Sequence, residues 1–536
     1  MKLRHLLFGL LAGVAFVACT NDDDPAGASP VNGGDKVATA DKYIAVNLKM
    51  PSGAATRADG DETVAPGESD VKKATFLFFR GNVQVALPFS ITLPGNDANG
   101  DAWTPGDGLK KSALIVMKEP TDIPTSLVVL INYMPEVKQE TKLDELQKIV
   151  ADYSDTSTGF VMSNAVYNDA AGNVIGAPVS ADNVKNDVQA AKANPVKVYV
   201  DRVLAKVTVT TDSELDPEGG IATGVEGIKA VIKGWGLVYE NTQSYLIKKL
   251  GTTYDYAWTW NDAANHRSYW AEAAEYKTKT VKDEQNNDVV TGPSYNDPDL
   301  PQLDAVLYTQ ENTNNQTWTD GAAANPTAVV VFATLMNGTS AVDLYKFGNV
   351  LLAADDIKTL LVNKAIKKFY TKDADGGYIP VKASDFTMSE PDPAAGEDYQ
   401  AKMYLTTTLA KVYYDVKEAD DGSVTAKEYD NTGVNNDLKN NLGELVELFK
   451  GGATYYYVPI KQHVAEGEND NDVYGIIRNH FYQIKITSIS GLGTAIPDQG
   501  QPIIPEKPKD DKYYLGAEIN ILDWVIKEQD VALGAE

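Results

Sequence analysis

Segments rich in aliphatic and aromatic residues, each bounded by Gly, Pro, Asn or Asp, recur along most of this chain. Such segments predict β-strands, because branched and aromatic side chains pack well on a pleated surface and the bounding residues form turns. The strongest are Ala74–Phe79, Ala86–Leu93, Ala113–Met117, Leu127–Tyr133, Val198–Val209, Ile228–Tyr239, Ser244–Leu250, Ala328–Leu335, Tyr455–Ile460 and Arg478–Ile489. Helical spacing of apolar residues occurs at Thr141–Tyr153, Ala354–Phe369 and Asn435–Phe449. The sequence therefore predicts a mainly β fold with a few short helices.

Shifts in composition divide the chain into segments. We expect a signal segment at 1–19, a tether with one isolated strand at 20–57, and β domains at 58–198 and 199–495. Residues 496–512 contain four prolines and predict a semi-rigid spacer before a last strand at 513–536. The stretch Pro51–Asp70, rich in Gly, Ala, Pro, Asp and Glu, predicts a flexible linker.

The first residues have the pattern of a lipoprotein signal. Lys2 and Arg4 precede an apolar run from Leu6 to Val17, and small residues then lead to Cys19. The run is too short to cross about 30 Å of hydrocarbon as a helix, so we expect it to be removed and Cys19 to carry acyl chains such as palmitate. The precursor would touch the outer membrane only through this lipid anchor. A buried N-terminal helix is the alternative.

Composition excludes several classes of function. Cys19 is the only cysteine, which excludes cysteine-based metal motifs and internal disulfides. A net charge of -27 would repel a phosphate backbone, so we expect no nucleic acid partner. No nucleophile elbow, zinc-protease motif or phosphate-binding loop occurs, and we expect no catalytic residue, cofactor or metal. Solvated turns are the preferred interpretation of two acidic stretches, Asp373–Gly377 and Glu466–Asp472.

Two apolar strands are separated from the rest of the chain by linkers, one near each end. The first places Ile44, Val46, Leu48 and Met50 at every second position. The last does so with Leu515, Ala517, Ile519 and Ile521, and then takes the opposite phase at Trp524 and Ile526. Unpaired apolar strands promote aggregation, so each strand needs a partner. One arrangement uses both: the first strand fills a groove in its own subunit until it is removed, and the last strand of a neighbour then replaces it. Head-to-tail addition of this kind produces a filament.

Removal of the first strand requires a cut, and Arg57 is the candidate position. It is the only basic residue between Met50 and Lys72, and it lies in a loop of small and polar residues. Cleavage between Arg57 and Ala58 would release the lipid anchor together with the first strand. A surface-anchored lipoprotein that binds glycans or proteins without polymerising stays open as an alternative. Its candidate sugar-stacking residues are Trp258, Trp260, Trp270 and Trp318.

The order of several short motifs resembles the fimbrillins, the subunits of type V pili, and is most similar to the minor-fimbrium shaft type. Besides the lipobox and the Arg57 loop, the motifs are Gly159–Asn164, Val200–Val207, Gly234–Leu237, Tyr308–Thr313, Arg478–Ile486 and Ile519–Trp524. The resemblance implies two transthyretin-like β-sandwich domains, cleavage after Arg57 by an arginine-directed protease, and donor-strand exchange with the segment from Tyr513 onward. It also implies a homopolymer, the shaft of an adhesive fimbrium on the cell surface, with accessory tip and anchor subunits as further partners.

Overall fold

The computed structural model describes part of the chain. The described residues are 41–49, 65, 67–98, 100–103, 112–118, 120–138, 140–165, 167–168, 174–249, 271–282, 285–315, 324–347, 350–352, 356–360, 363, 369–388, 402–403, 405–430, 432–433, 436, 446–462, 473–496, 498–505 and 515–523. These residues form mainly β structure, which confirms the predicted fold class.

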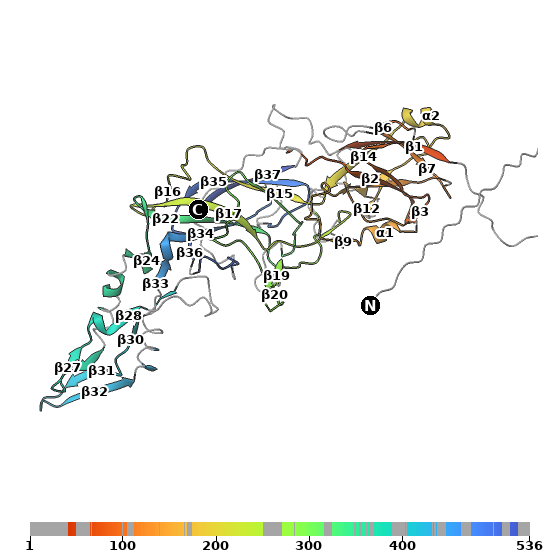
Figure 1. Cartoon of the computed structure of the whole chain (residues 1–536). Coiled ribbons are helices and arrows are strands. Elements are labelled where there is room, and N and C mark those ends of the chain that lie inside the picture. The colour runs from red at the N-terminus through yellow and green to blue at the C-terminus, as the bar shows by residue number, and fades with distance from the viewer. Residues whose placement is uncertain are drawn as a thin grey trace, which may run out of the picture. The chain divides into compact units, whose positions relative to one another are not determined.

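The first group of strands forms one sheet, of which Figure 1 labels β1, β2, β3, β7 and β14. Its main path runs β3-β2-β8-β10-β14-β1-β7, with β4 paired to β2 and β13 paired to β8. The strands are β1 (Lys42–Lys49), β2 (Lys73–Arg80), β3 (Val83–Gln84), β4 (Phe89–Thr92), β7 (Ser112–Met117), β8 (Ser126–Ile131), β10 (Met162–Asn164), β13 (Ala177–Pro178) and β14 (Val196–Arg202). Side chains from β1, β7 and β14 share one buried cluster with those from β2 and β8, so the two parts of the sheet enclose a common core.

The second group of strands forms two sheets that face each other. One sheet has the order β21-β15-β35-β37, and the other has β16-β17-β22-β34-β36 with β23 paired to β22. Their bounds are β15 (Ala205–Thr211), β16 (Ile221–Ala222), β17 (Ile228–Val238), β21 (Val306–Thr309), β22 (Ala328–Asn337), β23 (Ser340–Ala341), β34 (Ala453–Pro459), β35 (His480–Ile489), β36 (Thr494–Ala495) and β37 (Leu515–Asp523). Val207 and Ile484 of the first sheet and Trp235 and Val331 of the second belong to the same buried cluster.

A long insertion separates β22 from β34, two strands that are neighbours in the sheet and pair Thr334 with Ala453. Within the described residues it contains β24 (Leu344–Phe347), β25 (Val350–Leu352), β26 (Tyr370–Lys372), β27 (Tyr378–Pro380), β28 (Phe386–Met388), β29 (Lys402–Met403), β30 (Leu405–Thr407), β31 (Lys411–Glu418), β32 (Val424–Asp430) and β33 (Val446–Phe449). Phe347 and Phe449 join the buried cluster of the second group, so the insertion continues that core.

The remaining elements are short. Two-stranded sheets are formed by β5 (Gly95–Asn96) with β6 (Ala102–Trp103), β9 (Val150–Ala151) with β18 (Ser244–Tyr245), β11 (Tyr167–Asn168) with β12 (Val174–Ile175), and β19 (Thr280–Lys282) with β20 (Asp288–Val290). The described part of the chain includes the short helices α1 (Leu143–Leu146), α2 (Val188–Ala193), η1 (Ala383–Asp385) and η3 (Lys450–Gly452). No described helix is both long and apolar enough to cross a bilayer.

The sequence patterns misplace some boundaries. Helical spacing at Thr141–Tyr153 gives only α1, because Val150 and Ala151 pair with β18 instead. The helix predicted to reach Phe449 is wrong at its end, where β33 pairs with β24 and tertiary contacts override local spacing. β14 belongs to the first sheet throughout, so the change to the second group falls after Arg202 and not after Val198.

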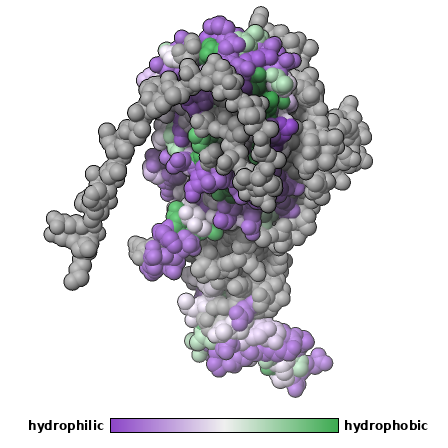
Figure 2. Space-filling view, turned by 90° about the vertical axis from the view of Figure 1, so that its right-hand side faces the viewer, coloured by the Kyte–Doolittle hydropathy of each residue, from purple (hydrophilic) through white to green (hydrophobic). Residues whose placement is uncertain are grey.

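The described surface on the face shown in Figure 2 is mainly hydrophilic, with small separate hydrophobic spots. This polarity accords with a net charge of -27, which favours solubility.

Candidate strand-exchange site

The predicted removable strand is an interior strand of the first sheet. β1 lies between β14, which runs parallel to it, and β7, which runs antiparallel. Ile44, Val46 and Leu48 are fully buried in the core. Burial of an aliphatic side chain stabilises a fold by about 1.5 to 3 kcal/mol. Loss of β1 would therefore open an apolar groove bordered by two unpaired strand edges.

The other face of β1 is covered by α2. Ala45 is buried there against Leu114 of β7 and Ala191 of α2. The helix begins after Asp187, whose carboxylate accepts a hydrogen bond of 2.8 Å from the backbone N–H of Ala190. This cap satisfies a donor that the first turn leaves without a partner, and it fixes where the helix starts above the strand. The groove therefore has room for large side chains on one face and for small ones on the other.

The two ends of β1 have different surroundings. At its amino end, Tyr43 exchanges two backbone hydrogen bonds with Lys185, of 2.8 and 3.0 Å. At its carboxyl end, Lys49 pairs with Tyr199, close to the point where β14 passes into the second group of strands. The carboxyl end of the groove thus faces the rest of the same molecule.

Downstream of the Arg57 loop the chain is fixed by Glu68. Its carboxylate lies 2.7 Å from the Lys206 ammonium and accepts a hydrogen bond of 2.7 Å from the Tyr308 hydroxyl. Its backbone carbonyl accepts a hydrogen bond of 2.9 Å from Arg202 Nε, and its other carboxylate oxygen accepts one from the N–H of Ala65. Glu68, Arg202 and Lys206 are buried. The end of the predicted flexible linker is therefore an anchored turn.

Burial sets the ionisation of this group. It lowers the pKa of Arg202 to about 10, although the neighbouring carboxylates of Glu68 and Asp201 oppose the shift. It raises the pKa of Tyr308, and the hydrogen bond to Glu68 acts in the same direction. At neutral pH the arginine stays charged and the tyrosine stays protonated, so the hydroxyl donates to the carboxylate.

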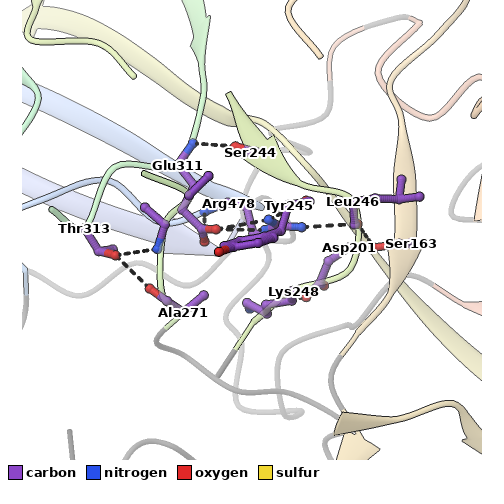
Figure 3. A network of polar contacts seen from close by, with 12 residues as sticks. Ser163, Asp201, Ser244, Tyr245, Leu246, Lys248, Ala271, Glu311, Thr313 and Arg478 are labelled. Atoms are coloured by element: carbon purple, nitrogen blue, oxygen red, sulfur yellow. Dashed lines mark hydrogen bonds and ion pairs between the residues drawn. The ribbon is translucent and has the colours of Figure 1, made fainter. Parts of the chain in front are cut away.

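A second buried polar network lies beside the first (Figure 3). Arg478 and Glu311 form two charge-assisted contacts, Nη2 to Oε2 at 3.0 Å and Nε to Oε2 at 3.2 Å. Arg478 also donates to the carbonyl of Tyr245 at 2.7 Å, and Lys248 pairs with Asp201 at 3.5 Å. Removing one partner of such a buried pair costs far more than the intact pair contributes, because it leaves a charge without compensation.

Four of the motifs that carry the family resemblance meet in these two networks. Ser163 donates to the carbonyl of Leu246 at 2.7 Å, and Asn479 donates to Asp201 at 2.8 Å. Residues of Gly159–Asn164, Val200–Val207, Tyr308–Thr313 and Arg478–Ile486 are thus brought together from distant parts of the chain. Sequence order alone could not reveal this, because each contact joins segments far apart in the chain.

The predicted donor strand lies along its own second sheet. β37 pairs antiparallel with β35, with His480 opposite Asp523 at one end and Ile489 opposite Leu515 at the other. Sequence analysis expects this strand to be separate from its domain. The difference has a physical reason: in a single molecule β1 occupies the groove, and the outer edge of β35 is available to a strand of this length.

The other predicted site residues lie outside the described part of the chain. These are Cys19, Met50, Arg57, Ala58, Trp524 and Ile526, and the same holds for Trp258, Trp260, Trp270 and Trp318. Within the described ranges no group of three or more His, Cys, Asp or Glu side chains is placed to hold a metal ion. Asp373 accepts hydrogen bonds from the N–H groups of Asp375 and Gly377, which is the geometry of a turn.

A family model described as major fimbrial subunit protein type IV, fimbrillin, C-terminal, matches residues 447–530. This segment contains β34 to β37, including the predicted donor strand. This part of the chain is similar to the C-terminal region of fimbrillins. The chain has no match among the curated proteins that were searched.

Solved structures similar to this chain include a candidate cell adhesion protein from Parabacteroides distasonis. It shares 14% identity over 91% of this chain and 98% of that one, with a TM-score of 0.38. A fimbrilin from Porphyromonas gingivalis shares 14% identity over 91% of this chain and 98% of that one, with a TM-score of 0.36. The tip fimbrial protein of the same organism, truncated at its C-terminus, shares 13% identity over 90% of this chain and 100% of that one, with a TM-score of 0.33. At these scores the overall superpositions are poor, so the similarity to fimbrillins rests on residues 447–530.

Proposed function

We propose that this protein is a fimbrillin and acts as a pilin, a shaft subunit of a cell-surface fimbrium. It is exported as a lipoprotein acylated at Cys19, cut after Arg57 by an arginine-directed protease, and polymerised by donor-strand exchange. The observation that carries the proposal is the position of β1, an interior strand that precedes the Arg57 loop and fills an apolar groove between β7 and β14.

The two ends of the cut separate for a physical reason. Glu68 holds the chain downstream of Arg57 through its contacts to Lys206, Tyr308 and Arg202. β1 is held upstream by its sheet neighbours, by packing, by the backbone hydrogen bonds between Tyr43 and Lys185, and by polar contacts at its exposed amino end. After the cut, β1 can leave without unfolding of the anchored turn, and the open groove can receive a strand of another copy.

The donor in this proposal is β37. Among the described strands it occupies the outer edge of its sheet and pairs with β35 alone. An edge strand can leave by breaking one ladder, whereas an interior strand must break two. Release from β35 followed by insertion between β7 and β14 exchanges one ladder for two, and the second ladder with its buried side chains favours the polymer.

A reversible lock on β37 tests this assignment. Gln483 and Asn520 are opposite each other in β35 and β37, so the double substitution Gln483→Cys and Asn520→Cys places two thiols at a distance that a disulfide can bridge. Cys19 lies upstream of Arg57 and leaves with the cut segment, so these would be the only thiols in the matured chain.

We expect the oxidised double variant, cut after Arg57, to remain monomeric, and to form filaments once a reductant is added. Electron microscopy and ladders in mild detergent report the polymer. The two single-cysteine variants, cut in the same way but kept reduced throughout, serve as controls and should polymerise like the unaltered chain. Normal polymerisation of the locked variant would show that β37 is not the donor. Absence of polymer from the cut, unaltered chain would contradict the proposed function itself.

A further inference from the structure

The groove that β1 fills restricts which donor residue can stand at each position. Ile44, Val46 and Leu48 point into the core, whereas Ala45 points the other way, toward α2. Ala191 of the helix and Leu114 of β7 close the space around the Ala45 methyl group, and all three residues are buried. A strand that replaces β1 therefore needs a small residue at this position, or α2 must move.

The donor segment offers one small residue on the corresponding face. Leu515, Ala517, Ile519 and Ile521 lie on one face of an extended strand, and Gly516, Glu518 and Asn520 lie on the other. Shifting the strand by two residues would place Glu518 beneath α2, and shifting it by four would place Asn520 there. Burying a carboxylate or an amide there without a partner costs more than the aliphatic contacts that such a shift could gain. The match between Gly516 and the Ala45 position thus selects one register.

The surroundings of the groove also select a direction. The carboxyl end of β1 is followed by the anchored turn at Glu68, and Lys49 there pairs with Tyr199 near the second group of strands. The donor reaches the groove from another copy, on the spacer that precedes it. It enters at the opposite end, beside Tyr43 and Lys185. Its first residues then lie at that end, so it runs in the same direction as β1.

We propose, on the basis of the proposed function, that β37 of one copy lies parallel to β14 of the next, with Gly516 beneath α2 in the place of Ala45. Leu515, Ala517 and Ile519 then take the places of Ile44, Val46 and Leu48. Gly516 determines the register in which two subunits join, because α2 leaves room for only a small residue at this position.

Disulfide capture tests the direction and register. In the proposed arrangement Asn520 takes the place of Lys49, which is opposite Tyr199 in β14. We expect Tyr199→Cys combined with Asn520→Cys to form an intermolecular disulfide in filaments grown under reduction from the cut chain and then oxidised. If residues 516–520 filled the same five positions in the opposite direction, Gly516 would take the place of Lys49. Tyr199→Cys with Gly516→Cys is therefore the opposing pair. Capture through the second pair and not the first would overturn the proposal, although polymerisation itself would still support the proposed function.

Substitution by size tests the contact with α2. We expect Gly516→Val to slow polymerisation of the cut chain at least about tenfold, because the added side chain overfills the space beneath the helix. Asn520→Val is the matched control, since its side chain would project at the Lys49 position and not beneath α2, and it should polymerise at close to the normal rate. Thermal unfolding of each uncut variant checks that the fold is intact. Equal rates for the two variants would refute the assignment of Gly516. If the cut, unaltered chain does not polymerise, the proposed function fails before the register is tested.

Discussion

The carboxylate of Glu68 lies 2.7 Å from the ammonium of Lys206, and both side chains are buried. This ion pair joins the segment that follows the Arg57 loop to β15, the first strand of the second group. On the proposed pathway it is one of the contacts of Glu68 that keep the downstream end of the cut chain in place.

Glu68→Ala should strongly destabilise the uncut chain. The substitution leaves the Lys206 ammonium buried without its carboxylate, and loss of one partner of a buried pair costs about 3 to 5 kcal/mol. Urea unfolding measures the difference. Asp70→Ala is the control, because Asp70 pairs with Lys72 where both side chains are at least half exposed, and such pairs contribute at most about 1 kcal/mol. Similar losses for the two variants would contradict the importance of this buried pair.

Val46→Ala should affect the precursor and the matured chain differently. It removes buried methyl groups from β1 and should lower the stability of the precursor by about 2 kcal/mol. On the proposed pathway β1 leaves after the cut, so the variant should release it sooner and polymerise faster. Val198→Ala in β14 is equally buried but remains in the subunit, and it should weaken both forms. Calorimetry and light scattering distinguish the two outcomes; slower polymerisation of Val46→Ala would argue that β1 stays.

Alkaline pH should destabilise the fold. Burial raises the pKa of several described tyrosines above the ordinary value of 10.0, most strongly those of Tyr153, Tyr308, Tyr456 and Tyr482. Above about pH 10 the unfolded chain loses these protons while the folded chain keeps them, so stability falls as pH rises. The lowered pKa values of Arg202, about 10, and of Lys233 act in the opposite sense but involve fewer groups. Urea midpoints measured between pH 8 and about 11.5 should therefore decrease, and Tyr456→Phe should reduce the slope. A flat profile would disprove the expectation.

Gly452→Ala should be costly where the insertion returns to β34. Gly452 has a φ of +73°, and a Cβ there would lie 2.2 Å from the carbonyl oxygen of Leu335. Backbone strain of this kind alone costs about 1 to 3 kcal/mol, and the clash adds to it. Gly451 also has a positive φ of +59°, but the nearest atom to its Cβ would be 3.5 Å away, so Gly451→Ala should cost less. Thermal unfolding compares the two, and a smaller effect at Gly452 would be the contrary result.

Local patterns predicted the strands well and parts of the site. Alternation alone placed Ile44, Val46 and Leu48 on a core face, and the apolar runs at Ile228–Tyr239 and Ala328–Leu335 became β17 and β22. These predictions succeed because side-chain period and burial are properties of a single strand.

Other features depended on partners far away in the chain. Glu68 lies in a stretch whose composition predicts a flexible linker, and nothing local indicates its ion pair with Lys206. Ala45 lies on the polar-looking face of its strand, and its burial requires α2, which sequence analysis did not predict. The one local sign of that helix was Asp187, a favoured residue at a helix start.

β7 has β1 as its one ladder partner among the described strands. On the proposed pathway a cut molecule that has not yet received a donor strand therefore holds β7 without a ladder, by side-chain packing and by the hydrogen bonds that Leu114 makes with Ala98 and Asp97. The inner edges of β7 and β14 are then unpaired. Such an intermediate could pair with the first available strand of any other chain. Cleavage close to a growing filament end would shorten the lifetime of this intermediate. The time and place of cleavage would therefore limit wrong strand pairing and aggregation during assembly.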